Sequence, residues 1–394
     1  MNLQERFTSL AASMIETRRD FHAHPEIAFE ETRTAGIVAD RLEKAGYTPR
    51  RSVGGTGVVA VLEGGRPGPT VLARADMDAL PVPDEKDVAY RSTVAGKNHA
   101  CGHDGHTTIL LTIAEVLASE ASSLPGRIVF VFQPAEEITE GAKAMLADGA
   151  LEGIEVDEVV GLHLSSDQPA GVVAVRSGPA MAAPDAFDLV IRGSGGHAAM
   201  PQRVVDPVVI AAQVITAVQS IVARNVDPVD QAVISITRIE GGTAYNIIPE
   251  EVRIAGTIRS FDPATRSALA SRLEAVASGL AASLGGSAEL TVHEGPPAVV
   301  NDAWTTERVR EVARRVVGDE AVDEAPMIMG GDDMALWMNQ AQGCYFFFGT
   351  RSNDATGFPH HHPRFDVDDA VLPKAADVLA NVIVDLLERP LERA

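Results

Sequence analysis

The chain is poor in cysteine and in long apolar runs. Only two cysteines, Cys101 and Cys344, occur among 394 residues, which argues against a disulfide framework and favours a reducing compartment. No segment approaches the roughly 20 apolar residues of a membrane helix. Charges interrupt the N-terminal stretch MNLQERFTSLAASMIETRRDF, which lacks the apolar core of a signal peptide. We therefore expect a cytoplasmic protein without a membrane partner.

Positive charge is also scarce. Lys and Arg total 33 against 55 Asp and Glu, which gives a formal net charge of -22. Nucleic acids and anionic membranes are bound through basic patches, so this balance argues against both as partners. The acidic surplus says nothing about a reaction, because ordinary solubility explains it equally well.

The first and last parts of the chain alternate strand-like and helix-like segments. Apolar strands are expected at 56–62, 70–75, 127–132, 159–164 and 345–349, and helices at 33–44, 105–119, 305–317 and 370–387. This alternation predicts an α/β fold with a mixed, mostly parallel sheet that is covered on both faces.

The middle of the chain follows another pattern. Its expected order is β-α-β-β-α-β, typical of a ferredoxin-like domain, with strands at 187–192, 231–240, 252–259 and 288–293 and helices at 206–224 and 263–284. The Pro-containing stretches SGPAMAAP and EGPPAV flank it, as domain hinges do. We therefore expect a catalytic domain in two parts, 1–182 and 296–394, with a domain inserted at 183–295.

Ten of the 11 histidines lie in five short motifs. These are FHAHP at 21–25, NHACGHDGH at 98–106, GLH at 161–163, GGH at 195–197 and PHHHP at 359–363. Histidines that serve only core packing would not cluster in this way. The clusters indicate chemistry that uses imidazole.

The motif NHACGHDGH places Cys101 two residues before His103. A thiolate and an imidazole are ligands for a divalent transition metal. The spacing is too tight for a structural zinc finger, and the Cys-x-x-Cys of a redox site is absent. The remaining alternative is a buried cysteine beside loop histidines.

Two carboxylates, Glu136 and Glu137, come directly after the apolar run at 127–132. One of them could bind a metal while the other takes a proton from water that the metal activates. Taken alone, a pair of adjacent glutamates is usually solvated surface.

Polar residues follow two further expected strands, with Asp76 and Asp78 after the first and His163 after the second. Because ligands bind at the carboxyl ends of parallel strands, these residues are expected at one edge with the glutamates. Alone, such an Asp is more often a turn or helix cap, and such a His is more often structural. His361 in HHHPRFD adds a late candidate, unless that segment is a surface loop.

Many ordered motifs carry a family resemblance, among them RRDFHAHPEIAFEE, RADMDALP, NHACGHDGH, QPAEE, GSGGHAAMP, GGTAYNIIP and HHPRFD. The chain resembles the metal-dependent family of aminoacylases, hippurate hydrolases and auxin-conjugate amidohydrolases, which are relatives of the glutamate carboxypeptidases. The resemblance implies a zinc-peptidase-like catalytic domain with an inserted ferredoxin-like domain, through which the chain forms a homodimer.

The resemblance also implies a dinuclear metal site with Cys101, His103, Glu137, His163 and His361 as ligands. Glu136 would be the general base, and Asp78 would orient a ligand. In the insert, His197 would stabilise the oxyanion in a partner subunit's site, and Asn246 and Arg259 would bind the substrate. Asn246 could instead cap a turn, and Arg259 could be a surface charge. Zinc suits thiolate and imidazole ligands, while carboxylates also admit manganese, cobalt or nickel.

The implied reaction is hydrolysis of a small N-acyl amino acid to a carboxylic acid and a free amino acid. A dipeptidase or carboxypeptidase with the same metals is an alternative, and a non-catalytic metal-binding dimeric scaffold is another. Relatives often read Ser/Gly-Glu-Asp-Phe where this chain has Gly331-Asp332-Asp333-Met334. Met334 is therefore expected to change a loop on the substrate side.

Overall fold

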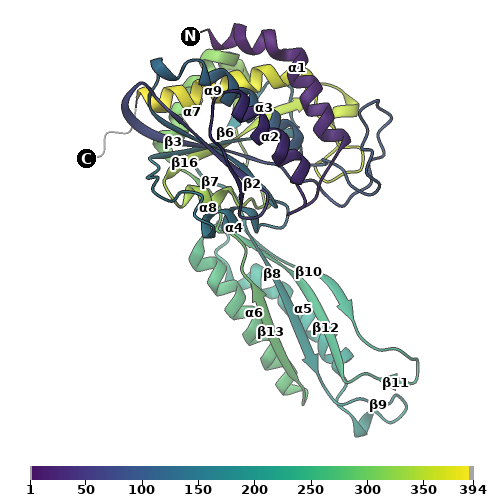
Figure 1. Ribbon diagram of the computed structural model, residues 1–394. Helices are drawn as coiled ribbons and strands as arrows, with labels where there is room; N and C mark the ends of the chain where they lie inside the picture. Colours follow the sequence, from purple (N-terminus) through teal and green to yellow (C-terminus); the bar gives the residue numbers. More distant parts are fainter. Residues whose placement is uncertain (1, 390–394) are drawn as a thin grey trace. The chain divides into compact units, whose positions relative to one another are not determined.

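The computed structural model describes residues 2–389, and the chain divides into two compact units (Figure 1). The first unit runs up to Ala180 and also comprises Val300–Pro326 and the chain from Asp333 onward. The second unit comprises Met181–Val299 and Met327–Asp332. Two short strands, β7 (Gly178–Met181) and β14 (Val299–Asn301), include the first two points at which the chain passes between the units.

The first unit is built on an 8-stranded sheet in the order β1-β2-β4-β3-β5-β16-β6-β15. Its strands are β1 (Arg50–Val53), β2 (Gly57–Glu63), β3 (Arg66–Asp76), β4 (Pro125–Gln133), β5 (Glu158–Pro169), β6 (Val173–Val175), β15 (Val322–Glu324) and β16 (Gln342–Arg351). The central pairs β4–β3, β3–β5 and β5–β16 are parallel, whereas β1–β2, β2–β4 and β16–β6 are antiparallel. The prediction of a mixed, mostly parallel sheet is therefore confirmed.

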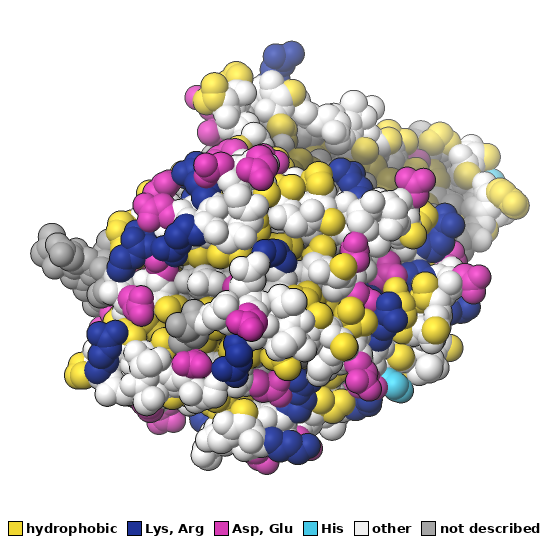
Figure 2. Space-filling view, turned by 90° about the horizontal axis from the view of Figure 1, so that it is seen from above, with side chains coloured by type: hydrophobic (Ala, Val, Ile, Leu, Met, Phe, Trp, Pro, Cys, Tyr) yellow, Lys and Arg dark blue, Asp and Glu magenta, His cyan; other side chains and the backbone are white. Residues whose placement is uncertain are grey.

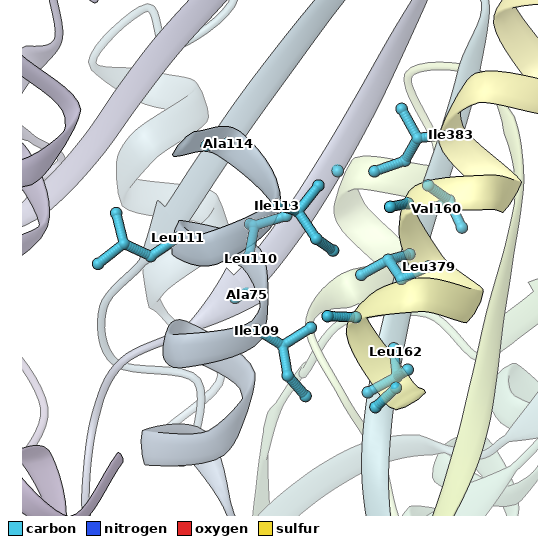
Figure 3. Close-up of a cluster of buried hydrophobic side chains, with 14 of the residues drawn as sticks. Ala75, Ile109, Leu110, Leu111, Ile113, Ala114, Val160, Leu162, Leu379 and Ile383 are labelled. Atoms are coloured by element: carbon cyan, nitrogen blue, oxygen red, sulfur yellow. The ribbon is translucent and has the colours of Figure 1, made fainter. Parts of the chain in front are cut away.

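Helices cover both faces of this sheet. They are α1 (Leu3–Ala23), α2 (Thr32–Lys44), α3 (His103–Ala118), α4 (Gly141–Ala147), α7 (Ala303–Val317), α8 (Met334–Met338) and α9 (Leu372–Glu388). Val160 and Leu162 of β5 lie with α3 and α9 in one apolar cluster (Figure 3). Between them, Gly161 faces the other way, toward Met334 of α8. Helices α3 and α9 therefore lie on one face and α8 lies on the other.

Helix α3 is almost wholly buried, because it fills the space between the sheet and helices α1 and α9. Its apolar residues Ile109, Leu110 and Ile113 point into this core (Figure 3). Burying each of these side chains contributes on the order of 1.5–3 kcal/mol. This packing fixes the helix N-terminus, where His103 is the first residue.

The second unit has a 4-stranded antiparallel sheet in the order β10-β12-β8-β13. Its elements follow the β-α-β-β-α-β order: β8 (Ala183–Arg192), α5 (Pro207–Asn225), β10 (Ala232–Glu240), β12 (Glu251–Ser260), α6 (Pro263–Ser283) and β13 (Ser287–His293). Both helices begin at an Asp-Pro pair, in which the carboxylate of Asp206 or Asp262 accepts N–H groups of the first turn. A short two-stranded antiparallel sheet of β9 (Gly196–His197) and β11 (Ile247–Ile248) also belongs to this unit.

Helix α5 is long and apolar enough to cross a membrane, judged by length and composition alone. Its residues Ile210, Val214 and Val218, however, are buried in the core of the second unit. The opposite side exposes Val208 and Val209. This helix therefore serves as a core helix of the unit.

Charged side chains of both signs lie interleaved on the face shown in Figure 2. Among the exposed ion pairs of the described chain, Arg51 lies 2.7 Å from Asp40 and 2.8 Å from Glu43. Such exposed pairs contribute about 0–1 kcal/mol each, so they affect solubility more than stability.

Candidate metal centre

Three parallel strands bring polar residues to one edge of the large sheet. Asp76 of β3 pairs with Gln133 of β4, and Arg74 pairs with Gly161 of β5. Asp76, Gln133 and His163 therefore lie at the same level. Asp78 follows β3 directly, and Glu136 and Glu137 follow β4. The structure thus brings these sequence-predicted residues together at the carboxyl edge.

Cys101 and His103 reach this edge from the N-terminus of α3. Gly102 precedes the helix with φ +90°, a conformation that glycine adopts readily. The Sγ of Cys101 is buried and lies 3.6 Å from Nε2 of His163 and 3.6 Å from Nδ1 of His360. The positive end of a helix dipole favours a thiolate, so this position suits a sulfur ligand.

Backbone carbonyls fix the orientation of two imidazoles. Nδ1 of His103 donates to the main-chain oxygen of Asp78 at 2.9 Å, and Nδ1 of His163 donates to that of Leu164 at 2.7 Å. A carbonyl can only accept, so the proton is on Nδ1 in both rings. The Nε2 atoms of His103 and His163 therefore face the site, where each can bind a metal in its deprotonated form.

Carboxylates surround Nε2 of His103 without bonding to it. This atom lies 3.7 Å from Oδ2 of Asp76, 3.8 Å from Oε2 of Glu136 and 3.8 Å from Oε1 of Glu137. Such separations are too long for hydrogen bonds but resemble the roughly 3.3–3.8 Å between neighbouring ligands of one tetrahedral zinc ion. Within residues 2–389, His103 Nε2 and Glu137 Oε1 are buried and have no hydrogen-bond partner. The donor set therefore fits a cation.

The electrostatics of the site agree with this fit. Burial opposes the charged form of His103, but Asp76, Asp78 and Glu137 raise its pKa to about 10. Burial, opposed by His103 and reinforced by Asp78 and Asp76, raises the pKa of Glu137 to about 7. The cluster thus holds more negative charge than its own side chains neutralise, and a divalent ion would relieve that repulsion.

His361 joins the site from the loop after β16. Its Nε2 lies 3.3 Å from Oε2 of Glu137, and its main-chain N–H donates to the main-chain oxygen of Ala100 at 2.8 Å. The residue has φ +66°, which is uncommon for a residue with a Cβ. Its side chain is 56% exposed, so it lies on the open side of the centre.

Asp78 supports the centre through three contacts. Its Oδ1 accepts the N–H of Glu136 and its Oδ2 accepts the N–H of Glu137, both at 3.1 Å. Its Oδ1 also lies 3.3 Å from Nδ1 of His103. One buried side chain therefore orients two candidate ligands and Glu136.

His106 is a supporting residue that sequence reasoning missed. Its Nδ1 bonds to Oδ1 of Asp76 at 2.6 Å, and its Nε2 accepts the N–H of Leu164 at 2.8 Å. Both ring nitrogens are used, so His106 holds Asp76 and β5 in place and is not available to a metal. The only signal was its position one helical turn after His103 in NHACGHDGH.

Arg18 of α1 was also missed. Its fully buried guanidinium lies 2.8 Å from Asp104, 2.7 Å from Asp366 and 3.1 Å from Asp369. Asp104 follows His103, and Asp366 closes the segment that carries His361. Arg18 thus joins two segments that bear candidate ligands, and the motif RRDFHAH was its only signal.

The second unit holds the other three predicted residues. His197 is exposed in β9, and Ala198 beside it donates to the oxygen of Asn246 at 3.0 Å. Arg259 pairs with Pro184 at the start of β8, whereas the two-stranded sheet of β9 and β11 follows the other end of that strand (Figure 1). Eight strand residues span roughly 25 Å, so one chain brings His197 and Asn246 together but not Arg259.

The expectation for Met334 is wrong. The residue is fully buried in α8, and its Cε lies 3.0 Å from where a Cβ on Gly161 would be. Met334 therefore packs beneath β5 and presents no surface to a substrate. Asp333 next to it bonds to Arg74 at 2.9 Å and Gln133 at 2.7 Å, so this segment is tied into the sheet.

A mixed, mostly parallel sheet with thiol, imidazole and carboxylate donors at its carboxyl edge is suited to holding metal ions. The chain belongs to peptidase family M20/M25/M40, whose pattern matches residues 72–385. The family resemblance seen in the motifs is therefore confirmed.

Two curated relatives and one solved structure illustrate the similarity. The chain is 41% identical over 369 residues to thermostable carboxypeptidase 2 of Saccharolobus solfataricus, covering 92% of each. It is 37% identical over 379 residues to N-acetylcysteine deacetylase of Bacillus subtilis, covering 95% of this chain and 97% of that one. A Bacillus subtilis dinuclear metal binding peptidase of the M20 family superposes with a TM-score of 0.84 at 34% identity, over 97% and 99% of the two chains.

Proposed function

We propose that this protein hydrolyses the amide bond of N-acyl amino acids and releases a carboxylic acid and a free amino acid. The observation that carries the proposal is the position of Glu136, whose carboxylate lies 3.8 Å from His103 Nε2 beside the cluster of metal-competent donors. A carboxylate there is suited to proton transfer with an activated water. A relative named N-acetylcysteine deacetylase gives further support.

The proposed centre uses two divalent metal ions, held by Cys101, His103, Glu137, His163 and His361. When bound, such ions supply Lewis acidity to the amide carbonyl and lower the pKa of water toward neutrality. The thiolate and the imidazoles suit zinc, while manganese, cobalt and nickel accept the same donor types.

Glu136 would carry the proton through the whole reaction. It takes a proton from water as the water oxygen attacks the amide carbon. It then gives that proton to the nitrogen as the carbon–nitrogen bond breaks, so that the amine leaves neutral. Asp78 holds the N–H of Glu136 and thereby the direction of its carboxylate.

The inserted unit would complete the site in a homodimer. We propose that His197 stabilises the oxyanion in the partner subunit's centre, and that Asn246 and Arg259 bind the substrate's carboxylate or carbonyl. The separation of His197 and Arg259 within one chain supports this, because a small substrate could touch both only if two chains supply them. The planar guanidinium of Arg259 is well suited to a carboxylate.

Substitution of the base tests the mechanism. Glu136→Gln should lower kcat by about 10²- to 10⁴-fold, because proton transfer contributes that much, while bound metal stays at the wild-type level. Glu140→Gln is the matched control, since Glu140 lies in the same turn but its exposed carboxylate pairs with Lys143. Substantial residual turnover in Glu136→Gln would refute the assigned role.

A carboxypeptidase or dipeptidase is the second candidate, because a relative of 41% identity carries a carboxypeptidase name. Parallel assays with N-acetyl amino acids, N-benzoyl amino acids and dipeptides, each with added Zn, Mn, Co and Ni, separate the two activities. A non-catalytic metal-binding scaffold would show no turnover in any of these assays. We expect the enzyme to work in the cytoplasm, without nucleic-acid or membrane partners.

A further inference from the structure

The segment 134–142, here called the glutamate turn, carries Glu136 and Glu137 between β4 and α4. Its backbone is strained. Ala135 has φ +53° and Thr139 has φ +57°, and the left-handed region costs a residue with a Cβ about 1–2 kcal/mol. A Cβ on Gly141 would lie 1.6 Å from the oxygen of Pro134, so the chain is also tightly folded. Such a turn persists only if its surroundings hold it.

Three buried carboxylates from separate elements hold it through main-chain N–H groups. Glu31 accepts from Ala135 at 2.9 Å, and Asp333 accepts from Ala142 at 2.9 Å. Asp78 accepts from the two glutamates between them. Each of these hydrogen bonds satisfies a main-chain N–H that would otherwise be buried without an acceptor, so the three side chains act as anchors.

Glu31 is free for this task because another residue caps its helix. Glu31 occupies the N-cap position of α2 but makes no capping hydrogen bond. Glu26 accepts the N–H groups of Arg33 at 2.9 Å and Thr34 at 2.8 Å in its place. The side chain of Glu31 turns inward toward the glutamate turn.

The contacts of Glu31 converge on strained backbone. Its Oε1 accepts the N–H of Phe29 at 3.0 Å as well as that of Ala135, and Phe29 also has a positive φ, +62°. Its Oε2 accepts the hydroxyl of Thr56 at 2.5 Å. Burial, opposed by the hydrogen bond from Thr56, raises the pKa of Glu31 to about 7. Burying this carboxyl group costs free energy, so its hydrogen bonds to Phe29 and Ala135 serve to hold the backbone.

We propose that Glu31 is a positioning residue, which fixes the Ala135 peptide and thereby the direction from which the Glu136 carboxylate faces His103. The proposal rests on the proposed function, in which Glu136 is the base. Ala135 directly precedes Glu136, so rotation of this peptide would turn the Glu136 side chain. Both glutamates keep their bonds to Asp78, but Glu137 lies one residue farther from the Ala135 peptide, so metal binding would change less than proton transfer.

Two conservative variants of Glu31 distinguish the effect of side-chain length from the effect of charge. Glu31→Asp keeps the charge but shortens the side chain, and kcat should fall about 10- to 100-fold, because a misplacement of about 1 Å costs that much. Glu31→Gln keeps an oxygen for Ala135 and can donate to Thr56, so it should retain most of the activity. Glu26→Asp is the matched control, since it perturbs the same loop without touching the glutamate turn, and its kcat should equal that of the wild type.

Three further measurements distinguish positioning from general stability. In Glu31→Asp, KM and bound metal should stay near the wild-type values while kcat falls. In metal-free protein, amide hydrogen exchange of segment 134–142 should be faster in Glu31→Asp but not in Glu26→Asp.

Two results would overturn the inference. One is wild-type kcat and wild-type exchange in Glu31→Asp, and the other is an equal loss of kcat in Glu26→Asp. If the wild-type protein hydrolyses no N-acyl amino acid with any metal, the proposed function fails. The exchange experiment still decides whether Glu31 holds the turn.

Discussion

Replacing Asp78 by Asn tests how the centre is held together. The aspartate offers one oxygen to the N–H of Glu136 and the other to the N–H of Glu137. Asparagine has one carbonyl oxygen, and its NH₂ group would face the second N–H. One of the two main-chain donors therefore loses its acceptor in a buried place.

The size of the effect follows from that lost acceptor. A buried N–H without a partner costs about 1–3 kcal/mol, which corresponds to about 5- to 150-fold in an equilibrium constant. Since Glu137 is a proposed ligand, the cost should appear as a higher Kd for metal. His103 keeps its bond to the main-chain oxygen of Asp78, so the loss should stay within this range.

Metal titration against a competing chelator measures this Kd, together with kcat/KM at saturating metal. Asp84→Asn is the matched control, because Asp84 is also buried and accepts two main-chain N–H groups, from Lys86 and Ser92, on separate oxygens. It should lose stability without losing metal affinity. Wild-type metal affinity in Asp78→Asn, or an equal loss in Asp84→Asn, would refute the reasoning.

Two further predictions concern stability. Burial raises the pKa of Glu158 from 4.5 to about 7, so the folded state keeps a proton that the unfolded chain has lost, and stability should fall as pH rises through this window. Glu158→Gln should remove that fall: its effect on the free energy of unfolding, measured with urea, should be about 1–3 kcal/mol more favourable at pH 8 than at pH 5. An equal effect of the substitution at both pH values would contradict this. Removing metal with a chelator should lower the Tm, which calorimetry can measure. Metal added at 100 times its Kd should restore about 2.7 kcal/mol of the free energy of unfolding. An unchanged Tm would exclude a metal site in the folded state.

The sequence predicted the sheet and its active edge because both depend on local patterns. Apolar runs define the strands, and residues that directly follow parallel strands must share an edge. For that reason Glu136 and His163 could be placed together although 26 residues separate them. Hydrophobic periodicity predicted α3, but the helix begins at His103, two residues earlier than expected.

The supporting residues could not be predicted, because their roles depend on partners far away in the chain. His103 and His106 look equivalent in the motif, and only the N–H of Leu164 shows that His106 has no free nitrogen. Glu31 resembles a helix cap until Ala135, 104 residues later, is placed beside it. The expectation for Met334 was wrong for a related reason, because the direction in which α8 faces depends on its packing against β5.

The position of β16 in the sheet has a consequence for biosynthesis. This strand is hydrogen-bonded between β5 and β6, yet it lies at 342–351 and is therefore synthesised only after the whole second unit. Until β16 has been synthesised, one edge of the apolar strand β5 therefore has no hydrogen-bonding partner strand. His361 is synthesised after β16. Exposed strand edges promote aggregation, so we expect the nascent chain to need protection at β5 until β16 has been made. The proposed set of metal ligands is complete only after His361 has been synthesised.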